Sequence, residues 1–189
     1  MGRGKKIVDI EVVVDAAIAL IEESGLEEFS TRRLASRLGI SAMTLYNYYE
    51  NRKAILEGAL NKSLTLMWEG LDGEVAAWRA QGGHALGAYR VLSDHLLAFA
   101  QARPSLCRFI LTERAGFDWT ADNGKIERIC RDSEGGARPE QLSRDIYLFE
   151  LIVFALAFKV ISGGETPERF RELVGEGYEL LLGRRGQAS

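Results

Sequence analysis

The sequence predicts an all-α protein, and three observations bear on this prediction. Stretches in which apolar side chains recur every three or four residues fill most of the 189 positions, as amphipathic helices require. Hydrophobic residues make up 47% of the chain, which is enough for one large core or two small ones. Charged residues make up 27%, which is typical of a folded protein rather than a disordered one.

The first predicted helix spans residues 9–24. Its apolar residues form a single stripe, and Asp9 is expected to cap its start while Gly25 ends it. This helix supplies an apolar face on which the two short helices that follow are expected to pack, because helices of that length are marginal alone.

Residues 30–56, STRRLASRLGISAMTLYNYYENRKAIL, predict two short helices, a tight turn and the start of a third helix. Ser30 is expected to cap the helix 31–38, and Gly39 follows it where a left-handed residue ends a helix. Ser41 is expected to cap a second helix that runs from Ala42 to Tyr48 or Tyr49. Asn51 would cap the third. Two such helices around a glycine-containing turn form a helix-turn-helix unit.

The rest of the chain is predicted to form further helices, with a joint at the Gly82–Gly83 pair. Their expected ranges are 51–71, 74–101, a helix that begins at Pro104, a short helix at 123–131, 139–161 and 167–182. Gly175 and Gly177 lie inside the last helix, where each costs about 1 kcal/mol relative to alanine. We therefore expect a neighbouring helix to approach closely there.

The helix 139–161 is apolar on nearly all sides from residue 146 onward, with Glu150 and Lys159 as its only charges there. Such a helix is buried on all sides or crosses a membrane. Sixteen residues are too few for a comfortable crossing, and no apolar run reaches the ~18–20 residues that a membrane span needs. We therefore expect burial between the protein's own core and a second subunit, and no membrane contact.

Catalytic, cofactor and metal motifs do not appear in the sequence, which has no HExxH, phosphate-binding glycine loop or nucleophile elbow. Asp94 and His95 are adjacent on a predicted helix, so their side chains point in different directions. Cys107 and Cys130 lie 23 positions apart without the close pairs of a zinc site. The sequence therefore predicts a protein that is not an enzyme and carries no metal or cofactor.

The helix-turn-helix region carries side chains of the types that are suited to contact DNA. Leu45 and Tyr49 lie four residues apart and are expected to face inward, which leaves hydroxyl, amide and small apolar side chains outside. Basic residues begin the helices on either side, where free N–H groups also favour phosphate. The candidate DNA contacts are Thr31, Arg32, Ser41, Met43, Thr44, Tyr46, Asn47, Tyr48, Arg52 and Lys53.

The charge balance argues against a general nucleic-acid coat. Residues 1–62 hold 9 basic and 9 acidic residues, whereas residues 63–189 hold 15 basic and 18 acidic residues. Net charge is −3 for the whole chain. Recognition of DNA must then come from a few placed side chains rather than from a broad basic surface.

The string TRRLASRLGISAMTLYNYYENRKAIL resembles the DNA-binding domain of TetR-family transcriptional regulators. The resemblance covers about residues 9–60, and the remainder is similar only in its succession of helices. It implies about nine helices, with a three-helix DNA-binding domain at residues 1–55 and an effector-binding and dimerisation domain at 56–189. It also implies a cytoplasmic homodimer through helices 139–161 and 167–182, which binds a palindromic operator until a small molecule releases it.

The resemblance places the eight candidates from Thr31 to Tyr48 where the family touches DNA. Arg52 occupies the place of a phosphate-binding lysine, and Lys53 lies beside it.

The effector site is predicted more loosely, from aromatic and polar residues of the C-terminal helices. The candidates are Trp68, Tyr89, Leu92, His95, Phe99, Phe109, Phe117, Trp119, Tyr147, Glu150 and Phe154. Their aromatic content favours a small, largely apolar or aromatic effector. Glu150 needs a partner in its apolar surroundings, and we expect it to face the pocket or to pair across a dimer with Arg144 or Lys159.

Two alternatives stay open at the level of sequence. The first is a helical DNA-binding regulator that responds to a protein partner instead of a ligand. The second is a helical ligand-binding protein or enzyme in which the helix-turn-helix is incidental.

Overall fold

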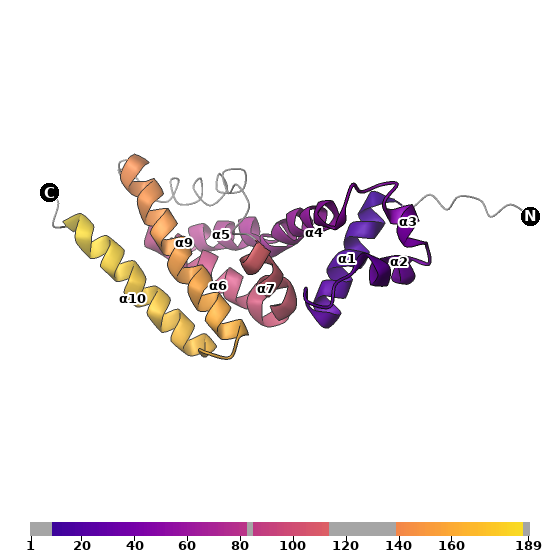
Figure 1. The fold of residues 1–189 in the computed structure, drawn as a ribbon. Coiled ribbons are helices and arrows are strands. Elements are labelled where there is room, and N and C mark those ends of the chain that lie inside the picture. Colours follow the sequence, from indigo (N-terminus) through magenta and orange to yellow (C-terminus); the bar gives the residue numbers. More distant parts are fainter. Residues whose placement is uncertain (1–8, 83–84, 114–138, 187–189) are drawn as a thin grey trace, which may run out of the picture. The chain divides into compact units, whose positions relative to one another are not determined.

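The computed structural model describes residues 9–82, 85–113 and 139–186, and these ranges contain helices and turns but no strands (Figure 1). The predicted all-α class is therefore confirmed. The predicted short helix at 123–131 lies outside the described residues. The helices are α1 (Ile10–Ser24), α2 (Thr31–Leu38), α3 (Ala42–Leu45), α4 (Arg52–Met67), α5 (Leu71–Ala80), α6 (Ala85–Ala102), α7 (Pro104–Glu113), α9 (Pro139–Ile161) and α10 (Pro167–Gly186).

Packing divides the chain into two compact units. The first unit holds α1 to α4 together with α7, and the second holds α5, α6, α9 and α10. α7 therefore belongs with the N-terminal helices although α5 and α6 precede it in the chain. The predicted domain boundary between residues 55 and 56 separates a DNA-binding domain from an effector-binding and dimerisation domain. That assignment stays a prediction.

In the first unit, α1 is the central element and packs against α2, α4 and α7. Its predicted stripe of apolar residues is buried from Val13 to Ile21, whereas Ile10 at its start is 55% exposed. Leu34 of α2 and Leu45 of α3 are both fully buried. A charged contact also joins α1 to the start of α7, because Arg103 Nε donates to Glu22 Oε1 over 2.5 Å. The short helices α2 and α3 thus owe their stability to this core rather than to their own length.

The predicted helix caps of this unit are present. Asp9, Ser30, Ser41 and Asn51 each accept a hydrogen bond from a backbone N–H two or three residues later. Gly39 has φ 65° and ψ 35°, the left-handed conformation that lets the chain leave α2 and enter the turn.

Several predicted helix boundaries are wrong. The helix predicted at 51–71 ends at Met67, and Leu71 begins α5 instead. α3 is four residues long and ends at Leu45, instead of continuing to Tyr48 or Tyr49. Residues 44 and 46–48 are threonine, tyrosine, asparagine and tyrosine, all weak helix formers, so the chain continues as turns. In the other direction, α10 continues through Gly183 to Gly186, although Gly183 was expected to end it.

In the second unit, α9 and α10 run side by side, and both contact α6 (Figure 1). The two helical glycines of α10 differ in their surroundings. A Cβ at Gly177 would lie 3.1 Å from Ile152 Cδ1 of α9, which is the close approach that the sequence predicted. At Gly175 a Cβ would meet nothing within 4 Å, so close packing does not explain that glycine.

α9 is buried on one side and exposed on the other. Ile146, Phe149 and Val153 are buried, whereas the exposed fractions of Tyr147 and Leu151 are 60% and 50%. A single chain therefore leaves part of this apolar helix uncovered. Among the described helices, none has the length and apolar character that crossing a membrane requires.

Candidate nucleic-acid interface

The helix-turn-helix presents its polar residues because its apolar residues anchor it from behind. Leu34 and Leu45 are fully buried, and they hold α2 and α3 on either side of the turn at Gly39. With Leu45 inward, the neighbouring side chains of α3 point to the outside. Met43 is 76% exposed and Tyr46 is 45% exposed, although both are large and largely apolar. Exposed apolar side chains next to hydroxyls suit the mixed surface of a DNA major groove.

Two hydrogen bonds order the hydroxyl groups on this surface. The Thr31 and Tyr46 hydroxyl oxygens lie 3.2 Å apart, which links the start of α2 to the residue after α3. The Ser41 and Thr44 hydroxyl oxygens lie 2.9 Å apart across the first turn of α3. The first contact brings together two predicted DNA contacts that are 15 positions apart along the sequence, and the second orders two that lie within one turn of α3.

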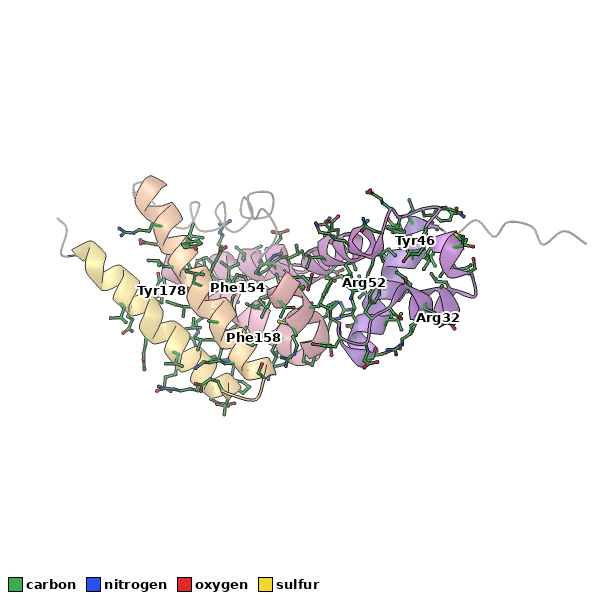
Figure 2. All side chains as sticks on the ribbon, viewed as in Figure 1. Arg32, Tyr46, Arg52, Phe154, Phe158 and Tyr178 are labelled. Atoms are coloured by element: carbon green, nitrogen blue, oxygen red, sulfur yellow. The ribbon has the colours of Figure 1, made fainter. Side chains whose placement is uncertain are left out.

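The remaining predicted contacts lie on the same unit. Arg32, Asn47, Arg52 and Lys53 are exposed, and Tyr48 is half-buried. Figure 2 shows Arg32 on α2, Tyr46 after α3 and Arg52 at the start of α4. The Arg52 guanidinium carbon lies 5.4 Å from the centre of the Phe29 ring, so its head group is held by a cation–π contact. Lys53 Nζ pairs with Glu57 Oε1 at 3.3 Å.

Tyr49 was expected to face inward, and it does so in part. It is half-buried, and its hydroxyl donates to the Ile10 carbonyl oxygen over 3.3 Å. Burial raises the pKa of this hydroxyl above its usual value. Tyr49 therefore ties the segment after α3 to α1 and leaves DNA contact to its neighbours.

The neutral charge of the N-terminal region has a structural explanation. Arg37 makes a two-pronged contact to the Glu23 carboxylate at 2.6 and 2.7 Å, and Arg33 lies 3.4 Å from Glu28. The hydrogen bonds from Arg37 hold the pKa of Glu23 below its usual value. The acidic residues thus neutralise arginines of α2 other than Arg32. Arg32 is in none of the ion pairs that the described residues make within this unit.

The predicted effector residues fall in different parts of the chain, and their role stays a prediction. Phe117 and Trp119 lie outside the described residues, and Phe109 is buried in the first unit while the other candidates belong to the second. His95 stacks on Trp68 with ring centres 6.1 Å apart, and its Nδ1 lies 2.9 Å from Glu74 Oε1.

Three further candidates lie on α9. Tyr147 is exposed, Phe154 is half-buried and Glu150 is 9% exposed. The two cations expected for Glu150 lie against other carboxylates, since Arg144 is 3.6 Å from Asp145 and Lys159 is 3.8 Å from Glu165. Glu150 is thus buried in a single chain, and the expectation that it faces the effector pocket or pairs across a dimer stays a prediction.

A pocket of about 610 Å³ lies in the second unit, and sequence reasoning identified only one of its residues, Tyr89. Leu92, Phe99 and the other candidates are not among those that line it. The lining residues are Tyr89, Arg90, Ser93, Asp94, Phe149, Arg171, Glu172, Val174, Gly175, Glu176, Tyr178 and Glu179. The available signal was Gly175, a glycine in mid-helix that no close helix contact requires.

Metal and catalytic chemistry find no support in the described part of the chain. Within it, no three or more His, Cys, Asp and Glu side chains are placed to hold a metal ion. Cys107 is buried, and burial raises the pKa of its thiol to about 12, which leaves it a poor nucleophile.

The fold and this surface define a class: an all-α protein with an N-terminal helix-turn-helix unit. Residues 13–59 match the profile of the bacterial regulatory proteins of the tetR family. The N-terminal domain is thus similar to that of the TetR family. This match to a family of regulatory proteins agrees with the prediction that the chain is not an enzyme.

Curated relatives are similar mainly in this domain. The class D tetracycline repressor of Escherichia coli is 45% identical over 47 residues, which cover 25% of this chain and 22% of that repressor. The chain thus matches less than a quarter of that relative's length. The nucleoid occlusion factor SlmA of Vibrio cholerae is 26% identical over 139 residues, covering 73% of this chain and 69% of that factor.

Solved structures share the fold of nearly the whole chain. A possible TetR-family transcriptional regulator from Streptomyces coelicolor A3(2) has a TM-score of 0.69 and 20% identity, with 96% of this chain and 100% of that chain covered. BioQ with its double-stranded DNA operator has a TM-score of 0.63 and 18% identity, covering 91% and 98%. A single-substitution variant of TetR from Acinetobacter baumannii AYE, in complex with minocycline, has a TM-score of 0.68 and 16% identity, covering 97% and 99%.

Proposed function

We propose that the protein is a homodimeric transcriptional repressor that binds a palindromic operator through α2, the turn and α3, and that a small-molecule effector bound in the second unit releases it. The observation that carries this proposal is the ordered surface around Tyr46, where exposed hydroxyl and apolar side chains stand beside Arg32. A repressor relative and a neighbour solved with its operator support it.

DNA contact divides into two kinds in this proposal. Met43 and Thr44 lie on α3 and supply contacts to base edges, where a methyl group or a hydroxyl distinguishes one base pair from another. Thr31, Arg32 and Tyr46 supply contacts to phosphate, because they surround the start of α2 and its free N–H groups. Phosphate contacts fix the position of α3, and contacts to bases then provide sequence preference.

Dimerisation is supported by the apolar residues that one chain leaves exposed on its last two helices. Tyr147, Leu151 and Phe158 recur at helical spacing on α9, and their exposed fractions are 60%, 50% and 38%. Leu180 on α10 is 72% exposed. A second copy that covers these residues pairs two helix-turn-helix units, which a palindromic site requires, with half-sites about one helical turn or a multiple apart.

The effector works by linkage. The protein has a form that binds DNA and a form that does not, and the ligand binds the second form more tightly. The ligand therefore weakens operator binding, and DNA weakens ligand binding by the same factor. The neighbour solved with minocycline shows that this fold holds a small molecule in another protein, and the pocket against α10 offers space for one here.

Selection of genomic fragments with the purified protein, followed by footprinting, tests the DNA-binding part. The expected result is protection of a palindrome with two half-sites. Failure to enrich any fragment above a scrambled-sequence control contradicts it.

The dimer is tested separately by sedimentation of Leu151→Glu, which is expected to shift the protein to a monomer and to weaken operator binding. Val12→Glu is the matched control, because Val12 is 51% exposed on α1 while Leu151 is 50% exposed on α9. A Leu151→Glu protein that stays dimeric excludes this face as the interface.

A further inference from the structure

The pocket in the second unit lies between α6 and α10, with one residue of α9 behind them. Arg171, Gly175, Tyr178 and Glu179 recur at helical spacing and form its α10 wall. Leu180 falls on a different side of α10, which is the side proposed for dimerisation. The pocket and the proposed dimer face are therefore separate surfaces of the same helix.

Three aromatic rings form the apolar part of this pocket. The ring centres of Tyr89 and Phe149 lie 4.7 Å apart at an interplanar angle of 73°, and those of Tyr89 and Tyr178 lie 5.2 Å apart. Tyr89 and Phe149 are each 3% exposed, so their positions are fixed by packing. A fixed group of aromatic rings binds an apolar or aromatic group, and its negative ring faces also attract a cation.

The charged residues around these rings carry an excess of negative charge. Four carboxylates and two guanidinium groups line the pocket, which gives a formal charge of −2. The two arginines both lie near Asp94, with Arg171 Nε at 3.1 Å and Arg90 Nε at 3.8 Å from its oxygens.

The other three carboxylates of the pocket belong to α10. Glu172 is paired with Arg169 of the same helix at 2.7 Å, whereas Glu176 and Glu179 are exposed and lie outside the close ion pairs that the described residues form. The negative potential is therefore concentrated at Glu176 and Glu179, on the α10 side.

Gly175 is the one glycine among the residues that line this pocket. Glycine is a weak helix former, so its place within α10 is unfavourable for the helix itself. A Cβ at this position meets no atom within 4 Å, and Gly175 lines the pocket. A methyl group here would therefore clash with nothing. The chain thus has a weak helix former at a position that lines the cavity.

We propose that this pocket binds an organic cation that carries aromatic groups, with the half-buried ring of Tyr178, packed on Tyr89 and Phe149, against its apolar part and Glu176 and Glu179 toward its charge. This proposal deepens the proposed function by naming the class of effector. Only the role of the cation as effector rests on the proposed function, whereas its binding to the pocket does not. Binding itself is measured without DNA, so a failure here and a failure of operator binding are distinguishable.

The experiment compares two probes of the same shape and opposite charge, tetraphenylphosphonium and tetraphenylborate, by calorimetric titration of the full-length protein. The phosphonium is expected to bind with one site per chain and at least tenfold more tightly than the borate. Raising the salt concentration is expected to weaken phosphonium binding, because part of the attraction is between charges.

Variants then locate the site. Gly175→Leu is expected to abolish phosphonium binding, whereas Gly175→Ala, which adds one methyl group, keeps it and serves as the control for helix stability. Glu176→Gln combined with Glu179→Gln is expected to weaken phosphonium binding about fivefold or more without changing thermal stability.

Three results overturn the proposal: no phosphonium binding, equal binding of the borate, or unchanged phosphonium affinity in a folded Gly175→Leu protein. If the phosphonium binds as expected and yet leaves operator affinity unchanged, the site stands and its role as the effector site fails. If no operator is found, the binding result still decides whether the pocket takes cations.

Discussion

The hydroxyl oxygens of Thr31 and Tyr46 lie 3.2 Å apart, so the first residue of α2 is tied to the residue that follows α3. This contact spans the whole helix-turn-helix and holds two candidate phosphate contacts in one place. Tyr46 is 45% exposed, and its hydroxyl therefore keeps room for a phosphate oxygen beside Thr31.

Removal of the Tyr46 hydroxyl is expected to weaken operator binding. Tyr46→Phe keeps the ring and loses both the bond to Thr31 and the proposed phosphate contact. A hydrogen bond to a charged group contributes about 1.5–3 kcal/mol, so the affinity is expected to fall roughly tenfold or more. Fluorescence anisotropy with the footprinted operator measures this.

The control for that experiment is Thr65→Ala, because Thr65 is an exposed residue of α4 whose hydroxyl donates to the Asn61 carbonyl of its own helix. Operator affinity is expected to stay unchanged in this variant. If Tyr46→Phe also retains full affinity, the hydroxyl does not contact phosphate.

Arg32 and Arg37 belong to the same helix, but they are expected to differ in their effect on DNA binding. Arg32 is exposed and outside the described ion pairs of its unit, whereas Arg37 is held by Glu23 at 2.6 Å. Arg32→Ala is expected to reduce the slope of log K against log salt by about 1.8 for the dimer, which is about 0.9 for the one phosphate contact that each chain loses. Arg37→Ala is expected to leave the slope unchanged. Equal slopes for both variants would place Arg32 away from the phosphates.

Sequence reasoning predicted the helix-turn-helix in detail because its signals are local. A cap at Ser30 or Ser41 and a left-handed residue at Gly39 depend on side chains within three positions of each other. The length of α3 was wrong because the hydrophobic period continues to Tyr49 although the helix does not. Tyr49 keeps its inward position by bonding the Ile10 carbonyl, a contact 39 positions away.

The pocket was missed for the opposite reason, since its wall joins residues that are 77 positions apart. Asp94 of α6 and Arg171 of α10 meet at 3.1 Å, and no pattern within either helix records that meeting. Large aromatic residues attracted the sequence prediction, whereas Gly175 and the carboxylates around it line the cavity. A cavity results from how the helices pack, and its one signal in the sequence was Gly175, a residue without a side chain.

The turn at Gly39 is expected to be sensitive to any side chain. Its φ of 65° lies in the left-handed region, where an L residue is strained by about 1–2 kcal/mol. Gly39→Ala is therefore expected to lower the free energy of unfolding by about that amount, as measured by urea denaturation. Gly73→Ala is the comparison, because Gly73 lies in α5 with nothing within 4 Å of a Cβ, and it is expected to stabilise by up to ~1 kcal/mol. A Gly39→Ala protein as stable as Gly73→Ala would contradict the strain at the turn.

The buried thiol of Cys107 reports on the opening of the first unit. Burial raises its pKa to about 12, so at pH 8 only about one molecule in 10⁴ carries the thiolate that reacts with a disulfide reagent. An unfolded chain has a thiol pKa near 8.5 and about a quarter thiolate at the same pH. In a Cys130→Ser background, labelling of Cys107 with an aromatic disulfide is expected to be at least about 10³-fold slower in the folded protein than in guanidinium. Arg103→Ala, which removes the contact to Glu22 at the start of α7, is expected to speed labelling in the folded state. Labelling of the folded protein at the denatured rate would show that α7 does not shield Cys107 in solution.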